Sequence, residues 1–292
     1  MLPLIEIIRR ESKPLAPLPT DIDAQLKVLP RIRCVVFDVY GTLMVSGVGD
    51  ISHSSADDRG EAIFELFKQK EIPLKQELTE PGAELNAIIR EHQDQTRQTG
   101  IEYPEVDIRE VWEEFAKRYA DLPDDPIYRL FEELAIRFEL YVNPTWAMPH
   151  LESTLQALRD KDMRLGIVSN AQFFTPLLFN AYCNQHFESL GFDDDLCQWS
   201  YCFKEAKPST RMYRVNAMTL EAKYGILAEE VLYVGNDLLN DIVPASQVGF
   251  KTALFAGDKR SLRLREGDER VKGITPDLIV KSLDQLIDCV EA

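Results

Sequence analysis

The chain has 292 residues, of which 45% are hydrophobic and 28% are charged, a composition typical of a folded protein with two domains or one elaborated domain. Its 49 acidic and 33 basic residues give a net charge of −16, and a surface of that sign repels nucleic acid, which we exclude as a partner. No apolar run reaches the roughly 18 residues of a membrane helix, the first residues lack the basic start of a secretion signal, and the five cysteines form no CxxC pair. These features predict a cytoplasmic protein with reduced thiols and no membrane partner.

Residues 1–30 contain five prolines and one short apolar stretch, which predicts an extension without a hydrophobic core of its own. The apolar run 34–37 ends in Asp38 and is typical of a strand buried on both faces. From 47 to 145 the apolar residues repeat with the period of a helix, and this stretch carries 23 acidic and 11 basic residues. It predicts an all-α unit with four apolar stripes, centred on Ile63 and Leu66, Leu85 and Ile88, Trp112 and Phe115, and Leu134 and Phe138.

From residue 146 onward, short apolar runs alternate with helical patterns, which predicts a parallel sheet with helices on both faces. The predicted strands are 165–168, 231–234, 252–255 and 278–280. Because the first strand of this sheet must be the run 34–37, the helical stretch is an insertion directly after it. The predicted fold is therefore α/β, with a Rossmann-like parallel sheet core formed by residues 31–46 and 146–292 and an inserted all-α domain at 47–145.

Polar residues follow the predicted strands at their carboxyl ends, which is where open parallel sheets bind ligands. Asp38-Val39-Tyr40-Gly41-Thr42 follows the first strand, and Ser169-Asn170 follows the strand at 165–168. Lys207 lies in a loop before a helix, and the run Gly235–Asp241 follows the strand at 231–234. Taken singly, each is typical of a turn or a helix cap. Together they predict one polar rim.

In order and placement these residues resemble the four motifs of the haloacid dehalogenase-like (HAD) superfamily, which places a helical cap domain where 47–145 lies. The resemblance implies a hydrolase in which Asp38 is the nucleophile and forms a covalent intermediate. It implies that Ser169 hydrogen-bonds the transferring group and that Lys207 neutralises its charge and positions the nucleophile. The residues then expected to line the substrate site are Gly41, Thr42 and Asn170.

For a phosphate-transferring member, the resemblance implies a magnesium ion held by Asp38, by the backbone carbonyl of Tyr40 and by an acid of the fourth motif. Asp38, Asp237 and Asp241 facing one lysine leave an excess of negative charge, which a divalent cation would compensate. Asn236 stands where the first acid of that motif often falls. We expect Asp237 to bind the metal directly, and Asp241 to bind it through water or to support a residue that binds it.

Tyr40 departs from the phosphatase pattern, in which the residue two places after the nucleophile is an aspartate that protonates the leaving group. A phenol, with a reference pKa of about 10, is a weak replacement for a carboxyl group. The 2-haloacid dehalogenases of the superfamily resemble this chain at that position, because halide leaves without a proton. Tyr40 is nonetheless counted among the catalytic residues for its place beside Asp38.

Three functions follow from these observations. The acidic fourth motif favours a magnesium-dependent phosphatase that acts on a small phosphorylated metabolite through an aspartyl-phosphate at Asp38. The first alternative is a metal-independent 2-haloacid dehalogenase with an ester intermediate at Asp38. The second, of another class, is a catalytically silent binding module with the same fold. We expect a monomer or a homodimer.

The basic cluster at 259–265 is interpreted as a solvent-exposed connector.

Overall fold

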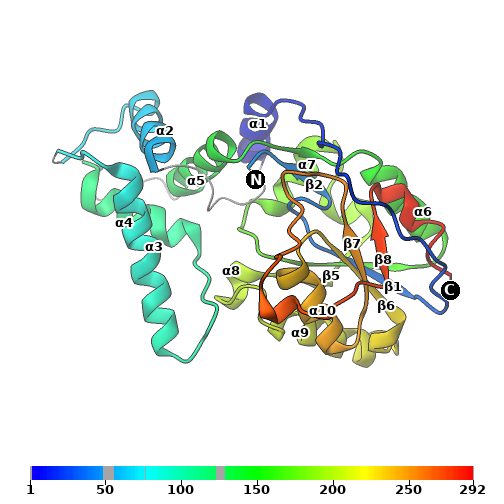
Figure 1. Cartoon of the computed structure of the whole chain (residues 1–292). Coiled ribbons are helices and arrows are strands. Elements are labelled where there is room, and N and C mark those ends of the chain that lie inside the picture. The colour runs from blue at the N-terminus through cyan, green and yellow to red at the C-terminus, as the bar shows by residue number, and fades with distance from the viewer. Residues whose placement is uncertain (1, 49–55, 76, 123–128, 292) are drawn as a thin grey trace.

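The structure, a computed structural model, describes residues 2–48, 56–75, 77–122 and 129–291. Its centre is a six-stranded sheet in which all neighbouring strands run parallel (Figure 1). The strand order is β5–β4–β1–β6–β7–β8, with β1 Cys34–Phe37, β4 Arg164–Ser169, β5 Phe192–Trp199, β6 Val231–Gly235, β7 Lys251–Phe255 and β8 Leu278–Val280. The predicted α/β, Rossmann-like fold is confirmed, and β1 lies in the middle of the sheet.

Helices cover both faces of the sheet because the side chains of its central strand alternate between two hydrophobic cores. Val35 and Phe37 face the core that contains α6 (Leu151–Asp160) and α7 (Thr175–Tyr182). Cys34 and Val36 face the core that contains α9 (Arg211–Tyr224) and α10 (Val243–Val248). All four residues of β1 are fully buried, and each such apolar side chain contributes about 1.5–3 kcal/mol to folding. This double burial explains the unbroken apolar run in the sequence.

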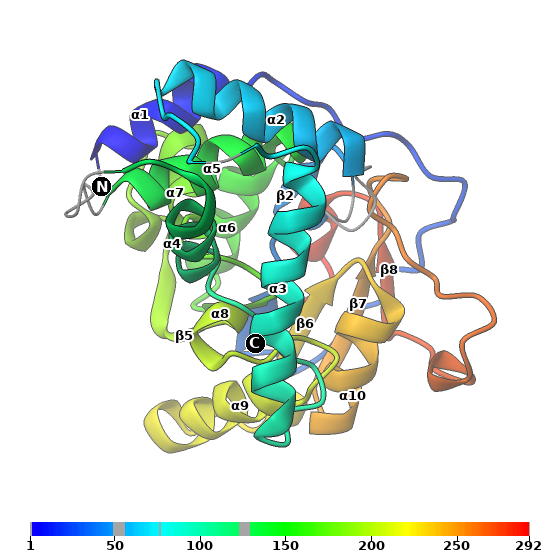
Figure 2. The same cartoon turned by 90° about the vertical axis from the view of Figure 1, so that its left-hand side faces the viewer.

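The inserted stretch forms a separate helical layer with its own core. Its helices are α2 (Ala56–Gln69), α3 (Pro81–Gln98), α4 (Ile108–Tyr119) and α5 (Arg129–Val142), and the four predicted apolar stripes are confirmed as their buried faces. Trp112 lies at the centre, with its ring centroid 5.7 Å from that of Phe115 and 5.4 Å from that of Phe138. Figures 1 and 2 show α2, α3 and α4 beside the sheet domain.

Two short strands join the cap helices to the sheet domain. β2 (Met44–Ser46) and β3 (Thr145–Ala147) pair antiparallel, so the chain leaves and re-enters the sheet domain at neighbouring points. The first connection follows Asp38 closely in the sequence, and the second pairs with the first. We call this pair the hinge strands. The predicted domain boundaries at 46 and 146 fall within the hinge strands. These boundaries stay a prediction.

Several elements were not predicted from the sequence. α1 (Leu2–Glu11) packs against α5 and α7 and buries Leu4, Ile5, Ile7 and Ile8, so the N-terminal residues contribute directly to the core. β5 was missed because it is an edge strand with the sequence Phe192-Asp193-Asp194-Asp195, and its middle residues are exposed. Edge strands tolerate charges that a central strand cannot bury. A register shift between Leu165 and Ile167 accommodates this strand.

Residues 12–30 form an extended arm that crosses the sheet domain beyond α1. Gln25 pairs antiparallel with Ile279 of β8, and Lys259 N donates to Leu18 O at 2.8 Å. The arm therefore connects the edge of the sheet with the loop that follows β7. Within the described ranges, no helix is both long and apolar enough to cross a membrane.

Candidate active site

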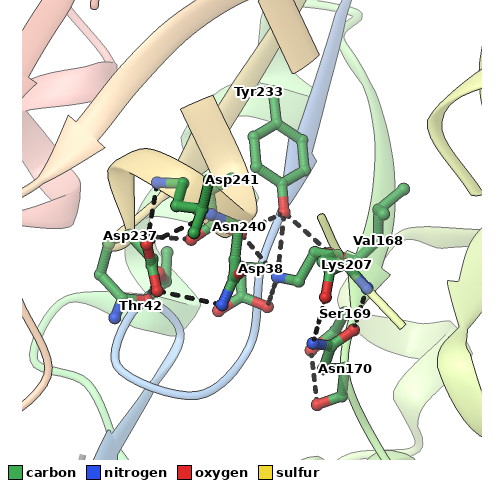
Figure 3. A network of polar contacts seen from close by, with 12 residues as sticks. Asp38, Thr42, Val168, Ser169, Asn170, Lys207, Tyr233, Asp237, Asn240 and Asp241 are labelled. Carbon is green, nitrogen blue, oxygen red and sulfur yellow. Dashed lines mark hydrogen bonds and ion pairs between the residues drawn. The ribbon is translucent and has the colours of Figure 1, made fainter. Parts of the chain in front are cut away.

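The predicted site residues converge at the carboxyl edge of the sheet (Figure 3). Asp38 follows β1, Ser169 ends β4, and Asp237 and Asp241 follow β6. Lys207 comes from the loop between α8 (Ser200–Phe203) and α9. These segments lie far apart in the sequence, and the parallel arrangement of β1, β4 and β6 places their ends at one rim.

Lys207 is the centre of the site. Its Nζ lies 2.7 Å from Asp38 Oδ1 and 2.6 Å from Asp241 Oδ1, and all three side chains are buried. Burial alone would lower the pKa of the lysine, but Asp241 and Asp38 raise it above its ordinary value, so the ammonium stays charged. A buried ammonium between two carboxylates fixes the orientation of both. Lys207 therefore holds the carboxylate of Asp38 in place.

Asp241 has a perturbed pKa. Burial raises it to about 7, the ammonium of Lys207 opposes the rise, and the charges of Asp38 and Asp237 add to it. The Tyr233 hydroxyl lies 3.0 Å from Asp241 Oδ1 and 2.8 Å from the carbonyl oxygen of Val168, and Asp237 N donates to Asp241 Oδ2 at 2.9 Å. A carboxyl group that titrates near neutral pH is suited to accept a proton from water.

Asp237 is paired with an arginine that the sequence analysis assigned to a connector. Arg265 Nε lies 3.1 Å from each carboxylate oxygen of Asp237, and its terminal nitrogen contacts Oδ2. Leu239 N and Asn240 N also donate to Asp237 Oδ1, at 2.9 and 3.2 Å, and cap the helical turn Leu238–Ile242. The signal that could have revealed Arg265 is its position: it lies in the loop after β7, whose carboxyl end is on the same rim.

Gly41 and Thr42 shape the loop after the nucleophile. Gly41 has a φ of +83°, and a Cβ there would lie 2.5 Å from Ser261 Cβ, so only glycine fits this turn. Thr42 is fully buried, and its hydroxyl donates to Asn236 Oδ1 at 3.1 Å. Asn236 Nδ2 in turn donates to Ser261 O at 2.6 Å. Both residues hold the first motif against the fourth, and their predicted role in binding substrate stays a prediction.

The second motif supports Lys207 from the other side. Asn170 Oδ1 accepts a hydrogen bond from Lys207 N at 2.7 Å, so the amide of Asn170 fixes the lysine backbone. Ser169 is fully buried beside it. Asn170 therefore also holds the lysine loop, and its predicted role in binding substrate stays a prediction.

Tyr40 points toward the cap side of the sheet domain. Its hydroxyl lies 3.0 Å from Thr175 Oγ1 at the start of α7, and its ring packs against the core that includes Phe174. Burial raises the pKa of the phenol well above its ordinary value, and the charge of Glu139 in α5 raises it further. Tyr40 is therefore a neutral hydroxyl and a very weak acid at neutral pH.

The side chains assigned to magnesium do not fit the ion as they stand. Arg265 contacts both oxygens of Asp237, and Lys207 and Asp237 N contact the two oxygens of Asp241. Within the described ranges, no three His, Cys, Asp or Glu side chains are grouped as a metal site requires. The excess of negative charge is also smaller than the sequence predicts. Two cations, Lys207 and Arg265, face the three acids, where the sequence counted Lys207 alone.

Comparison with known proteins identifies the family of the chain. The model of the haloacid dehalogenase-like hydrolases matches residues 32–249, and the chain belongs to this family. It is 24% identical to haloacetate dehalogenase H-2 of Moraxella sp. (strain B), a match that covers 90% of this chain and 99% of that protein. It is also 27% identical to a phosphoglycolate phosphatase of Salmonella choleraesuis, over 76% of this chain and 80% of that protein.

Solved structures share the fold. A 2-haloacid dehalogenase from Pseudomonas syringae superimposes with a TM-score of 0.55 at 17% identity, covering 87% of this chain and 96% of the other. A HAD phosphatase from Thermococcus onnurineus superimposes with a TM-score of 0.52 at 19% identity, again covering 87% of this chain and 96% of the other. The chain is therefore a hydrolase of the HAD type, and its relatives include both dehalogenases and phosphatases.

Proposed function

We propose that the protein is a hydrolase that displaces halide from a small 2-haloacid, with Asp38 as the nucleophile and without a metal ion. The observation that carries this proposal is the environment of Tyr40. The residue two places after the nucleophile offers no acid of useful pKa, because its hydroxyl is bonded to Thr175 and its pKa is raised by burial. A leaving group that departs as an anion needs no such acid. This reverses the order of preference that the sequence favoured.

In the first step, a carboxylate oxygen of Asp38 attacks the carbon that carries the halogen. The C–O bond forms as the carbon–halogen bond breaks, and the halide leaves with the bonding electron pair. The product is an ester between Asp38 and the 2-position of the acid. Lys207 lies 2.7 Å from Asp38 Oδ1 and holds the carboxylate for this attack.

In the second step, water adds to the carboxyl carbon of the ester. Asp241, with its pKa of about 7, is the group placed to take the proton of that water. Lys207 stabilises the negative charge that develops on the carboxyl oxygen. Collapse of this intermediate releases a 2-hydroxy acid and restores the Asp38 carboxylate, so the overall products are hydroxy acid, halide and one proton.

A magnesium-dependent phosphatase acting on a small phosphorylated metabolite is the second candidate. The observation in its favour is Asp237, a buried acid of the fourth motif that takes no direct part in either chemical step of halide displacement. The phosphatases among the relatives give it further support. For this function Asp237 would first have to leave Arg265.

The test is a paired assay on one preparation of the full chain. Halide release from 2-chloropropionate and bromoacetate is measured with EDTA and with MgCl₂, beside hydrolysis of p-nitrophenyl phosphate under the same conditions. We expect halide release that EDTA leaves unchanged and that Asp38→Asn abolishes. Phosphate release that requires MgCl₂, without halide release, would replace this proposal with the phosphatase. Absence of both activities would favour the silent binding module.

A further inference from the structure

The loop after β7 is part of the candidate site, although it lies beyond the residues that the family model matches. Arg263 N donates to Asn236 O, and Leu238 N donates to Arg263 O, both at 2.9 Å. These two hydrogen bonds join the loop to the fourth motif as a short parallel bridge between Asp237 and Arg263. Arg265 lies two residues after Arg263, so this attachment brings its side chain within reach of Asp237.

The N-terminal arm fixes this loop from its other side. Asp258, which is buried, accepts hydrogen bonds from Leu18 N at 3.0 Å and Arg260 N at 3.1 Å. Thr20 Oγ1 donates to Ala256 O at 2.6 Å. The arm, like the loop, lies largely outside the matched residues 32–249. The loop is thus anchored between the arm and the fourth motif, which determines where Arg265 lies.

The contact between Arg265 and Asp237 has the form of a strong ion pair. The Asp237 side chain is 9% exposed and that of Arg265 is 32% exposed. The guanidinium addresses both carboxylate oxygens, and this fork geometry suits arginine and not lysine, whose ammonium is a point charge. Asp237 is therefore paired with Arg265, whereas Asp38 and Asp241 are both paired with Lys207.

We propose that Arg265 is a positioning residue that takes the place of a divalent cation at the fourth motif. It holds the Asp237 carboxylate, and Asp237 N holds Asp241 Oδ2 at 2.9 Å. Asp241 in turn holds Lys207 beside the nucleophile. The inference rests on the proposed metal-independent function, which it deepens by naming the residue that makes metal unnecessary.

The first experiment measures magnesium binding without any substrate. Melting temperatures of the full chain are compared in EDTA and in millimolar MgCl₂ for the wild type, Arg265→Gln and Arg265→Lys. We expect no magnesium effect on the wild type. Arg265→Gln should melt several degrees lower in EDTA, because a buried carboxylate loses its partner, and MgCl₂ should restore part of that loss. Arg265→Lys should fall between the two.

Two further variants keep this experiment falsifiable. Arg270 forms a similar fork with Asp268 in the same loop, but its side chain is 55% exposed, so Arg270→Gln should change neither stability in EDTA nor the response to MgCl₂. The double variant Arg265→Gln/Asp237→Asn should lose the magnesium response, because the acid that would bind the ion is gone. A wild-type stabilisation by MgCl₂ that Asp237→Asn removes would overturn the proposal. An Arg265→Gln protein that ignores MgCl₂ would also overturn it.

The kinetic readout separates this inference from the proposed function. Where the wild type releases halide, Arg265→Gln should lower kcat at least tenfold with KM little changed, and Arg265→Lys should restore part of kcat. A raised KM with unchanged kcat would make Arg265 a substrate-binding residue and would overturn the positioning role. If the wild type releases no halide, the proposed function fails, while the melting experiment still decides whether Arg265 replaces a cation.

Discussion

Two buried carboxyl groups in this molecule have pKa values raised to about 7, in both cases mainly by burial, but their charged neighbours differ. Asp241, at the rim, lies 2.6 Å from the ammonium of Lys207, and the charges of Asp38 and Asp237 add to the effect of its burial. Burial is the main cause of the raised pKa of Glu139, in cap helix α5, and its carboxylate accepts a hydrogen bond from the Asn143 amide at 3.1 Å. The first belongs to a charged cluster that positions a nucleophile. The second is lined by uncharged side chains, and the charge of Arg59 slightly opposes the rise in its pKa.

The surroundings of Glu139 connect it to the hinge strands and not to the rim. Asn143 Oδ1 accepts a hydrogen bond from Ser46 Oγ at 2.7 Å, so the amide of Asn143 links Glu139 to β2. The seam around Glu139 is lined by Tyr40, Ile136, Leu140, Thr145, Phe174 and Leu178. A raised pKa alone does not make a carboxyl group catalytic, because its role in a reaction depends on the charged groups beside it. It predicts that substitutions at the rim act on turnover and substitutions at the seam act on stability.

Lys207→Met should have the largest effect. The change removes the cation shared by Asp38 and Asp241 and leaves two buried carboxylates facing each other, which costs about 3–5 kcal/mol for a broken buried pair. We expect kcat to fall by about 10³-fold or more and the melting temperature to fall as well. Circular dichroism checks that the variant is folded. A folded Lys207→Met protein with near-normal kcat would show that the ammonium does not position the nucleophile.

Asp241→Asn should separate the two chemical steps. The ester at Asp38 can form, but no carboxylate takes the proton of the attacking water, so halide release should stop at about one equivalent per site. Rapid quenching followed by mass spectrometry of the peptide around Asp38 would detect the trapped ester. Steady turnover at the wild-type rate is the result that removes Asp241 from the mechanism.

The pH dependence of turnover follows from the same group. Asp241 must be ionised to act as a base, and its pKa is raised to about 7 in the free enzyme, so kcat should fall at acidic pH and level off above 7. The inflection should lie below 7, because Asp38 carries no charge in the ester and no longer raises the pKa of Asp241. The measurement is kcat for halide release between pH 5 and 9 in buffers of constant ionic strength. A profile that is flat from pH 5 upward would mean that Asp241 does not limit the reaction.

Glu139→Gln should affect stability and leave turnover nearly unchanged. Burial raises the pKa of Glu139 from 4.5 to about 7, so between these pH values the unfolded chain loses its proton first and the free energy of unfolding falls as the pH rises. Above pH 7 this loss is complete and is on the order of 3 kcal/mol. Glutamine is always neutral, so the variant should be more stable than the wild type at pH 8 and similar to it at pH 4. Urea unfolding at both pH values tests this, and equal stabilities at pH 8 would contradict it.

Tyr40→Phe should have the smallest effect. The variant loses the hydrogen bond to Thr175, which costs about 1 kcal/mol, and the ring keeps its packing. If the phenol neither gives nor takes a proton in the reaction, kcat should change by less than about threefold. Tyr40→Thr is less informative because it also removes the ring. A large loss of kcat in Tyr40→Phe would restore Tyr40 as a catalytic acid.

The core of the fold and the rim could be predicted because each depends on a short local pattern. The strands β1, β4, β6, β7 and β8 are buried, which forces unbroken apolar runs, and parallel strands bring their carboxyl ends together. Asp38 and Asp241 could therefore be assigned to one site from their positions, and Lys207 joined them through the resemblance to the HAD motifs. The edge strand β5 could not be predicted in this way. It is partly exposed and carries three consecutive aspartates, so it lacks the apolar run that marks the other strands.

The partners of the motif residues were not predictable by the same reasoning. The position of Arg265 after β7 indicates the rim but not its pairing with Asp237, and no local signal distinguishes Tyr233 from an ordinary core tyrosine. The predicted excess of negative charge counted Lys207 as the one cation and left out Arg265, which also faces the acids. α1 lies in the stretch predicted to be an extension without a core of its own. A ten-residue helix is stabilised mainly by the elements it packs against, so its sequence alone does not reveal it.

The origin of the oxygen atom in the product tests the central claim most directly. A single turnover with excess enzyme in H₂¹⁸O should place the heavy oxygen in the carboxyl group of Asp38, because water attacks the carboxyl carbon of an ester intermediate. Mass spectrometry of the peptide that contains Asp38 reads this out. We predict that Asp38 gains ¹⁸O and that the first-turnover hydroxy acid does not. Heavy oxygen in that first product, with an unlabelled Asp38, would contradict nucleophilic attack by this residue.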